Sequence, residues 1–383
     1  MTISSDDLVG PATASRAGGC KPLRFHWSLS QAGNPFRRAT QTDQMPGIPP
    51  FEAQLELCRF ADEYGIDSVL MAIGFARPDP IVLSAALGRK TQRVKFMVAC
   101  RPGLISPTLF VQQINTLSLL LEGRVHVNIV GGHTPGELHY YGDWLPREER
   151  YARLDEFLTV CRAFWAEERG EVNFTGTYFQ VEGGRLKTPF SIGGRHGPEI
   201  YVGGNSEESA AHAIRHADCL WRFAEPPERL APAIASVVRS GTEVGLLVSL
   251  IGRSTRDKAI QAARDLVERL GDSAQETQLN FERHTDASAF RSTFALARSC
   301  DTGWATATLW TGAVPFLGPP AIALVGAAHE IADTLLEYRA IGVTQFLFTG
   351  WPDDEEMAFF GKRIAPLVRE REGVEAHAWR IRP

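Results

Sequence analysis

Short apolar runs rich in β-branched residues alternate along the chain with segments whose apolar residues recur every three or four positions. The runs are typical of buried strands and the three-to-four spacing is typical of helices. Alternation of this kind predicts a parallel sheet, and eight repeats of it predict a closed (β/α)₈ TIM barrel with insertions. The eight runs are Leu23–Leu29, Ile66–Met71, Val94–Cys100, Arg124–Val130, Glu199–Val202, Asp218–Trp221, Val244–Ile251 and Val343–Phe348.

One barrel accounts for nearly the whole chain. We expect a mobile tail over residues 1–22, a single barrel domain over 23–371 and a second tail over 372–383, with insertions at about 171–197 and 272–326. The first insertion has the pattern of a small hairpin. Helices are predicted at Phe51–Tyr64, Asp79–Leu87, Thr108–Leu121, Arg147–Trp165, Glu207–His216, Arg256–Leu270, Glu282–Leu296, Ala327–Ala340 and Glu355–Arg369.

The second insertion contains an aromatic stretch rich in Gly and Pro, Cys300–Pro320. A long irregular segment in a compact domain is typically a lid, a binding loop or a disordered linker. Because Trp304, Trp310 and Phe316 are too apolar for a solvated linker, we favour a mobile lid that closes over bound ligand.

Composition narrows the function classes. The net charge of −5 and the isoelectric point near 6.1 provide no basic field for nucleic acid. No apolar stretch approaches the roughly 20 residues that cross a bilayer, and residues 1–19 lack the basic and apolar regions of a signal peptide. Six scattered cysteines without a C-x-x-C pair favour reduced thiols in a cytoplasmic protein, and no metal-ligand set is evident.

In such a barrel the active site lies at the C-terminal ends of the strands. The fifth run ends in Gly203, Gly204, Asn205 and Ser206 and continues directly into a predicted helix. Two glycines permit close approach of a ligand, and a helix start offers free N–H groups, so this turn is a candidate phosphate cradle. An ordinary helix N-cap is the alternative for the same residues.

The fourth run presents Asn128 at its end, followed by Arg150 and Tyr151 at the start of the next helix. An Arg–Tyr pair at the same cradle could bind a phosphate, although Arg150 alone could equally be a solvated helix charge. No G-x-G-x-x-G, P-loop or G-x-S-x-G motif is present. Apolar, aromatic and amide-bearing strand ends suit a cofactor that brings its own reactivity.

At these residues the chain resembles the bacterial luciferase-like flavin monooxygenases, and within them the alkanesulfonate monooxygenase branch. The resemblance spans about residues 23 to 371. It is carried by TQRVKFMVACRP (91–102), SPT (106–108), EGRVHVNIVGG (122–132), ERY (149–151), YVGGNSEE (201–208), EPPERL (225–230), LW (309–310), ALVG (323–326) and TGWPDDEE (349–356).

The resemblance implies a barrel that uses reduced FMN supplied by a separate NAD(P)H-dependent flavin reductase, with O₂ as co-substrate and a flavin C4a-peroxide as the oxygen donor. It implies that Asn128 contacts the isoalloxazine ring and that Ala99 and Cys100 provide a close backbone approach to it. The phosphate ligands implied are Arg150, Tyr151, Gly203, Gly204, Asn205 and Ser206. It also implies a homodimer or homotetramer, for which Phe110 on the third helix is a candidate contact.

Several positions depart from the sulfonate branch. Leu247 and Ser249 stand where that branch has Arg and His, and Leu317 stands where its mobile loop has an Arg. Arg77 replaces a Cys, and Trp351 replaces a Tyr. Because a buried sulfonate needs cationic donors, two leucines in place of two arginines favour an uncharged substrate.

We therefore expect a two-component FMNH₂-dependent monooxygenase that inserts one oxygen atom into an uncharged organic substrate, such as an intermediate of specialised metabolism. The catalytic candidates are Ser249, Arg77 and Trp351. The candidate pocket walls are Trp27, Trp221, Leu247 and Leu317, with core packing the alternative for each tryptophan. The alternatives in function are a sulfonate or sulfone monooxygenase with a rearranged anion site at Arg77 or Arg222, a deazaflavin-dependent oxidoreductase, and a non-catalytic flavin-binding protein.

Overall fold

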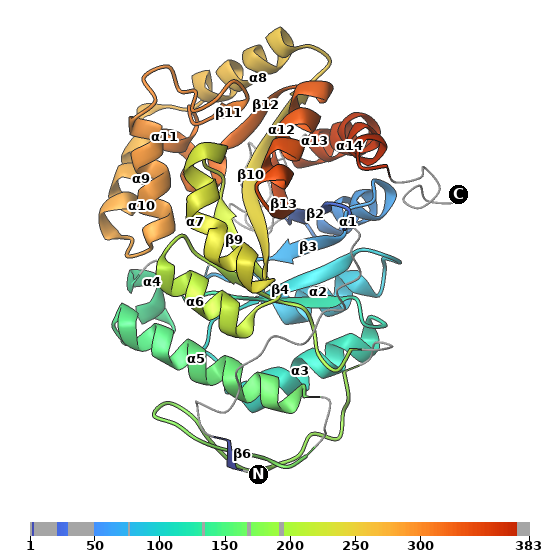
Figure 1. The fold of residues 1–383 in the computed structure, drawn as a ribbon, viewed down its shortest axis with the longest axis vertical. Coiled ribbons are helices and arrows are strands. Elements are labelled where there is room, and N and C mark those ends of the chain that lie inside the picture. The colour runs from blue at the N-terminus through green and yellow to red at the C-terminus, as the bar shows by residue number, and fades with distance from the viewer. Residues whose placement is uncertain are drawn as a thin grey trace.

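A computed structural model shows a barrel of parallel strands surrounded by helices (Figure 1). It describes residues 2–3, 21–29, 50–75, 77–131, 135–166, 170–190 and 195–373. The eight predicted runs are confirmed as the barrel strands. These are β2 (Arg24–Ser28), β3 (Ser68–Met71), β4 (Lys95–Cys100), β5 (Val125–Ile129), β8 (Ile200–Gly203), β9 (Cys219–Phe223), β10 (Glu243–Arg253) and β13 (Val343–Gly350).

The long strand β10 closes the barrel. Its first half pairs with β9, from Glu243 opposite Cys219 to Leu247 opposite Phe223, and its other edge pairs with β13. Beyond Leu247 it leaves β9 and pairs instead with β12 (Ala323–Ala327), to which the short β11 (Leu309–Trp310) adds in antiparallel orientation. Figure 1 shows β10 running from the middle of the molecule to the end where β11 and β12 lie beside it. The sheet is therefore split at the C-terminal end, between β9 and β10.

The helices begin at the capping residues that the sequence offers. Asp79, Ser106, Ser206 and Thr255 each accept a backbone N–H of the first turn with their side chains. Around the barrel lie α1 (Phe51–Glu63), α2 (Pro80–Gly88), α3 (Pro107–Leu120), α4 (Pro135–Tyr140), α5 (Arg147–Phe164), α6 (Glu207–His216), α7 (Pro227–Ser240), α8 (Arg256–Glu268) and α12 (Ala328–Ala340). The last helical segment is α13 (Asp353–Phe359), a π-helical turn over Phe360–Ile364 and α14 (Ala365–Arg371).

A network of paired charges fills the N-terminal end of the barrel interior. Arg24 Nη1 lies 2.6 Å from Glu199 Oε2, and Arg24 Nη2 lies 3.1 Å from Glu243 Oε2. Tyr201 donates its hydroxyl to Glu199 over 2.9 Å, and Gln345 donates to Glu243 over 2.7 Å. These groups satisfy one another, as buried charges must.

Two histidines lie one layer deeper in the interior. The ring of His26 is hydrogen-bonded to Ser68 Oγ at 2.7 Å and to Gln345 Oε1 at 2.9 Å. Both ring nitrogens of His126 are buried and have no hydrogen-bond partner in the part of the chain that the structure describes. Burial lowers the pKa of His126 to about 3, so this imidazole is neutral at pH 7.

The two insertions are more ordered than the sequence suggested. The first is the predicted hairpin, β6 (Val172–Thr175) and β7 (Gln180–Gly184), and β1 (Thr2–Ile3) adds to it as a third strand. The second contains α9 (Asp272–His284) and α10 (Ser288–Arg298) in place of one predicted helix. The break falls at Thr285, whose backbone is extended and whose hydroxyl accepts the Ala287 N–H.

The Cys300–Pro320 stretch is folded rather than irregular. It contributes β11, α11 (Val314–Leu317) and a 3₁₀ turn over Pro319–Ala321, and Trp310, Ala313 and Val314 are buried. In this structure it forms a packed wall beside β12. Its predicted closure over ligand stays a prediction.

Two further expectations need correction. The tails are not free throughout, because Thr2 and Ile3 pair with β6 and the side chain of Glu372 is fully buried, where it accepts the Leu23 N–H and pairs with Arg369. Phe110 is fully buried against Phe157, at a centroid distance of 5.4 Å, so it cannot contact a second subunit. None of the described helices is long and apolar enough to cross a bilayer.

Candidate functional site

The floor of the candidate site lies at the C-terminal ends of β4, β5 and β8. Alternation along the strands turns Ala99, Asn128 and Gly203 towards the barrel interior. Below them an apolar cluster fills the middle of the barrel. Its members are Leu70, Met97, Tyr201, Cys219, Trp221 and Leu347, with the partly buried Leu247 packed against it.

Asn128 carries a polar atom that no described residue satisfies. It pairs in register with Ala99, is 7% exposed, and its side-chain Oδ1 is buried with no partner among the described residues. Buried polar atoms are nearly always hydrogen-bonded, so an orphan at a barrel mouth indicates a ligand donor. Cys100 faces the opposite side, where burial raises the pKa of its thiol, and its carbonyl accepts the Val130 N–H. Only the backbone of Cys100 can therefore approach a ligand.

The turn that was predicted to be a phosphate cradle lies at the start of α6. A Cβ on Gly203 would meet nothing within 4 Å, so this glycine borders open space. At Gly204 a Cβ would come within 2.1 Å of Ser209 Oγ, and the φ of +154° is also unfavourable for other residues. The Gly204 N–H donates to the Trp221 carbonyl over 2.9 Å, and Ser206 caps the helix by accepting the Ser209 N–H. The turn is held tightly and presents a helix N-terminus.

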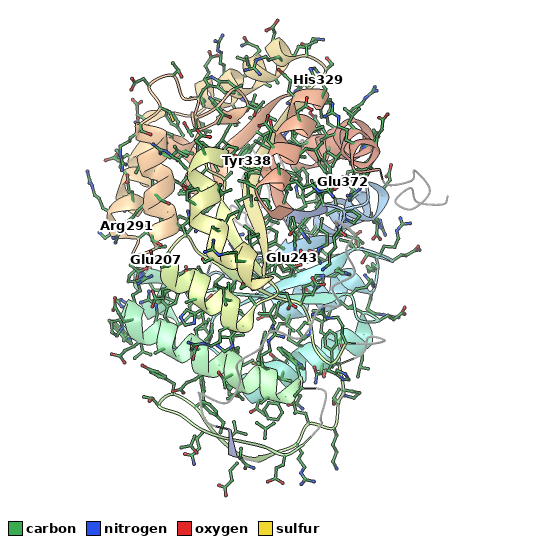
Figure 2. The ribbon with its side chains drawn as sticks, viewed as in Figure 1. Glu207, Glu243, Arg291, His329, Tyr338 and Glu372 are labelled. Carbon is green, nitrogen blue, oxygen red and sulfur yellow. The ribbon has the colours of Figure 1, made fainter. Side chains whose placement is uncertain are left out.

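Asn205 connects this cradle to the second insertion. Its Nδ2 donates to Ser292 of α10 over 3.1 Å and to Glu225 over 3.3 Å, while its Oδ1 is buried without a partner in the described chain. Figure 2 shows Glu207, the first residue of α6, and Arg291 of α10 on the same side of the molecule. The α9–α10 pair therefore borders the cradle.

Arg150 and Tyr151 also lie at the cradle, on the neighbouring helix α5. The two helices meet through a 2.8 Å ion pair between Arg147 and Glu208 and through the rings of Tyr151 and His212, whose centroids are 5.6 Å apart. A Cβ on Gly131 would lie 3.9 Å from the Tyr151 hydroxyl. The structure thus brings together the residues of the ERY and YVGGNS motifs.

The Arg150 side chain already has protein partners. Its guanidinium donates to the Gly131 carbonyl at 3.1 Å, to the Leu145 carbonyl at 3.0 Å and to Asp286 at 2.5 Å. A guanidinium has five N–H donors, so these contacts leave part of its capacity for a phosphate. As placed, Arg150 ties the segment after β5 to the α9–α10 connection.

These residues fit a flavin mononucleotide. The open space at Gly203 and the helix start beyond it suit one terminal phosphate, and the orphaned Asn128 oxygen, on the neighbouring strand, suits an N–H of the ring system. Ala99 and the apolar cluster beneath suit the flat ring face.

The candidate substrate residues fall in three different places. Trp221 and Leu247 belong to the apolar interior, where Trp221 stacks on Tyr201 at 5.4 Å, over Gly245. Trp27 lies on the outer face of the barrel, fully buried, with its indole N–H donating to Asp353 over 2.8 Å. That position makes Trp27 part of the core between barrel and helices.

Leu317 and Trp351 belong to a second apolar cluster, beside the split end of β10. Its other members include Ile251, Trp310 and Ala323. The indole N–H of Trp351 is buried with no partner among the described residues. The structure therefore brings Leu317 and Trp351 together but separates them from Leu247.

The two remaining catalytic candidates are placed as follows. Ser249 is fully buried, donates its hydroxyl to the Pro320 carbonyl over 2.6 Å and lies 2.5 Å from Thr349 Oγ1. It anchors the 3₁₀ turn that follows α11. The side chain of Arg77 packs over Gly74 together with Glu137, both within 3.4 Å of a Cβ built there.

Two polar residues at this end of the barrel, Arg101 and Asp286, were not named from the sequence, and Arg222 was named only as an alternative anion site. Arg101 and Arg222 are 3% and 6% exposed, and each has at least one buried side-chain nitrogen without a partner in the described chain. Asp286 pairs with Arg150. Arg101 could have been found, because it directly follows the end of β4. The contact of Asp286 joins segments 136 residues apart, and no local pattern reveals it.

No group of three metal-ligating side chains occurs among the described residues.

Comparison with known proteins places this geometry in a family. The model of the luciferase-like monooxygenases matches residues 23–345. Solved structures with the same fold include a riboflavin lyase bound to a modified FMN and riboflavin, with a TM-score of 0.75 at 18% identity, covering 93% of each chain. EDTA monooxygenase from Chelativorans sp. BNC1 has a TM-score of 0.70 at 18% identity, covering 94% of this chain and 96% of its own.

An F420-dependent secondary alcohol dehydrogenase shares the fold as well, with a TM-score of 0.62 at 18% identity, over 91% of this chain and all of its own. At such identities the structures show the fold alone. The family model covers most of the chain and agrees with the site at the barrel mouth. This chain belongs to the luciferase-like monooxygenases and is a flavin-dependent monooxygenase of that family.

Proposed function

We propose that this protein uses FMNH₂, supplied by a separate NAD(P)H-dependent flavin reductase, to insert one oxygen atom from O₂ into an uncharged organic substrate. The observation that carries the flavin assignment is the coincidence, at one end of the barrel, of an open glycine turn before α6 and the orphaned oxygen of Asn128. The reduced flavin supplies the electrons that activate O₂, and the protein supplies position and exclusion of water.

The uncharged substrate follows from the middle of the barrel. Leu247 contacts an interior cluster of aliphatic, aromatic and sulfur side chains. An anionic group held against it would lose its hydration without gaining a cation, which is unfavourable. A substrate held against this cluster should therefore be apolar and oriented by few polar contacts.

A binding assay and a labelling assay test this function. Reduced FMN should bind anaerobically with higher affinity than FAD and than reduced F420, because the cradle suits one terminal phosphate. With a reductase, NADH and ¹⁸O₂, an accepted substrate should gain one labelled atom while the second leaves as water. Higher affinity for F420, with hydride transfer and no oxygen incorporation, would contradict the proposal.

The turnover of simple alkanesulfonates tests the assignment of an uncharged substrate. Sulfite release from octanesulfonate should be at least about ten-fold slower than turnover of the best uncharged substrate, because the net value of a hydrogen bond to a charged group is about 1.5–3 kcal/mol. Comparable rates would instead support an anion site at Arg77 or Arg222.

A further inference from the structure

Arg101 is a buried cation at the C-terminal end of β4, and some of its N–H donors have no hydrogen-bond partner among the described residues. Its side chain is 4% exposed, and Nη2 donates to Glu137 Oε2 over 2.9 Å. Nε and Nη1 are both buried, and neither has a partner among the described residues. Because a folded protein rarely leaves such donors unsatisfied, they indicate an acceptor other than the residues that the structure describes.

Local charge balance defines the kind of acceptor. Among the described residues, two cations, Arg77 and Arg101, lie near two carboxylates, Glu137 and Asp79. Glu137 contacts Arg101 directly, and Asp79 caps α2 by accepting the Val82 N–H over 2.8 Å. With charges already matched, the remaining Arg101 donors favour a neutral oxygen over an additional anion.

Exposed aromatic rings surround the same position. Phe75, Tyr140 and Tyr141, here called the aromatic rim, lie together, with centroid distances of 5.0 Å from Phe75 to Tyr140 and 5.9 Å from Phe75 to Tyr141. Phe75 is 61% and Tyr140 68% exposed. The Arg101 guanidinium lies 5.8 Å from the Tyr141 ring. Grouped exposed rings offer a surface on which a planar apolar molecule can stack.

We propose that Arg101 and the aromatic rim form the substrate-recognition end of the site, and that the substrate is a neutral aromatic compound whose carbonyl oxygen accepts a hydrogen bond from Arg101. This inference rests on the proposed function, since it assigns the substrate class of the same site. Arg101 lies one residue beyond β4 and two residues beyond Ala99, and its Nη2 lies 3.5 Å from the carbonyl of Ile73, just beyond β3. A molecule bound there therefore lies at the same end of the barrel as the flavin floor.

The test compares 1-tetralone with tetralin, which share a ring system and differ in the carbonyl group. Binding of each is measured by calorimetry, with and without reduced FMN, under anaerobic conditions. The wild type should bind the ketone about ten-fold more tightly, the net value of one charge-assisted hydrogen bond. Arg101→Met should reduce this preference to about two-fold or less, because the donor is gone while tetralin contacts remain.

Arg256→Met is the matched control, because Arg256 also has one carboxylate partner, Glu330 at 2.9 Å, and one ring contact, Trp304 at 5.9 Å, but lies on α8. It should keep the wild-type preference. Arg101→Lys, which keeps the charge beside Glu137, should give an intermediate preference and serves if the Met variant does not fold.

Each outcome is decisive. Absence of a preference in the wild type, including absence of binding, overturns the carbonyl class, and a preference that persists in Arg101→Met overturns the role of Arg101. A loss of reduced-FMN affinity in Arg101→Met would assign Arg101 to a flavin carbonyl instead. If the wild type binds the ketone selectively but no flavin, the proposed function fails while this inference stands.

Discussion

The two ends of the barrel interior differ in how their buried polar groups are paired. At the N-terminal end, Arg24, Glu199 and Glu243 satisfy one another within 3.1 Å. At the C-terminal end, Asn128 and Arg101 keep buried polar atoms that no described residue satisfies. Buried polar groups cost stability unless paired, so the first end stabilises the fold and the second is prepared for a ligand.

Breaking the paired end should have the largest effect. Arg24→Met leaves the partly buried carboxylates of Glu199 and Glu243 with only the more exposed cations Arg195 and Lys21, so the free energy of unfolding should fall by about 2–3 kcal/mol in urea denaturation. Lys21→Met is the control, because Lys21 also contacts Glu243, at 3.2 Å, but its side chain is 69% exposed. Its loss should change stability by no more than about 1 kcal/mol. A loss below about 1 kcal/mol for Arg24→Met would show that the network is not what holds this end.

Acid titration examines the same end through His126. Burial lowers its pKa to about 3, against 6.5 in the unfolded chain, so its neutral form stabilises the fold above pH 6.5 and that stability is lost as the pH falls. Between pH 6.5 and 5.0 His126 should account for a loss of up to about 2 kcal/mol, before most carboxylates titrate. His126→Leu should therefore lose less stability than the wild type by this amount, and the loss that remains comes from buried histidines such as His26, whose pKa is also lowered by burial. Parallel profiles for the two proteins would contradict the buried neutral histidine.

Removal of the Arg150 side chain tests whether this residue contributes to ligand binding at the C-terminal end of the barrel. Arg150→Ala should weaken reduced-FMN binding about ten-fold or more in an anaerobic fluorescence titration, because a charge-assisted contact or the segment after β5 is lost. Asp286→Asn separates these causes. It should retain or raise the affinity if the freed guanidinium reaches the phosphate, and lower it if the Arg150–Asp286 pair only holds the segment. Equal affinity of wild type and Arg150→Ala would remove Arg150 from the site.

The smallest expected change is at Asn128. Asn128→Leu removes the orphaned oxygen, so the apoprotein should be as stable as the wild type or up to about 1 kcal/mol more stable. Reduced-FMN affinity should fall about five-fold, as expected for one neutral hydrogen bond. A marked destabilisation without loss of affinity would mean that Asn128 serves the fold and not the flavin.

The barrel, which is confirmed, and the turn before α6, whose role as a phosphate cradle stays a prediction, both follow from local patterns. The apolar composition of a short run is enough to indicate a buried strand. Gly203 to Ser206 form a turn whose geometry depends only on residues that are adjacent in the sequence. The outward position of Trp27 also follows from alternation, since His26 faces the interior, but its place at a strand end suggested a pocket. Strand ends alone do not reveal which face a side chain takes.

Contacts between distant segments could not be predicted in this way. The pair Arg150–Asp286 and the bond from Ser249 to Pro320 each depend on how the second insertion folds back on the barrel. The folded state of Cys300–Pro320 has the same origin, because β11 is stabilised by pairing with β12 and not by its own sequence. Such contacts are determined by tertiary packing, which composition and periodicity do not report.

Reduced-FMN affinity of Gly203→Val tests the central claim, that the flavin binds at the C-terminal end of the barrel, most directly. The new side chain enters space that is open in the structure, so the fold should lose no more than about 1 kcal/mol while reduced-FMN affinity falls at least about ten-fold. Gly271→Val is the matched control, because Gly271 also borders open space, with a φ of −87°, but precedes α9. Its affinity should equal that of the wild type. A folded Gly203→Val protein that binds reduced FMN as tightly as the wild type would contradict the account.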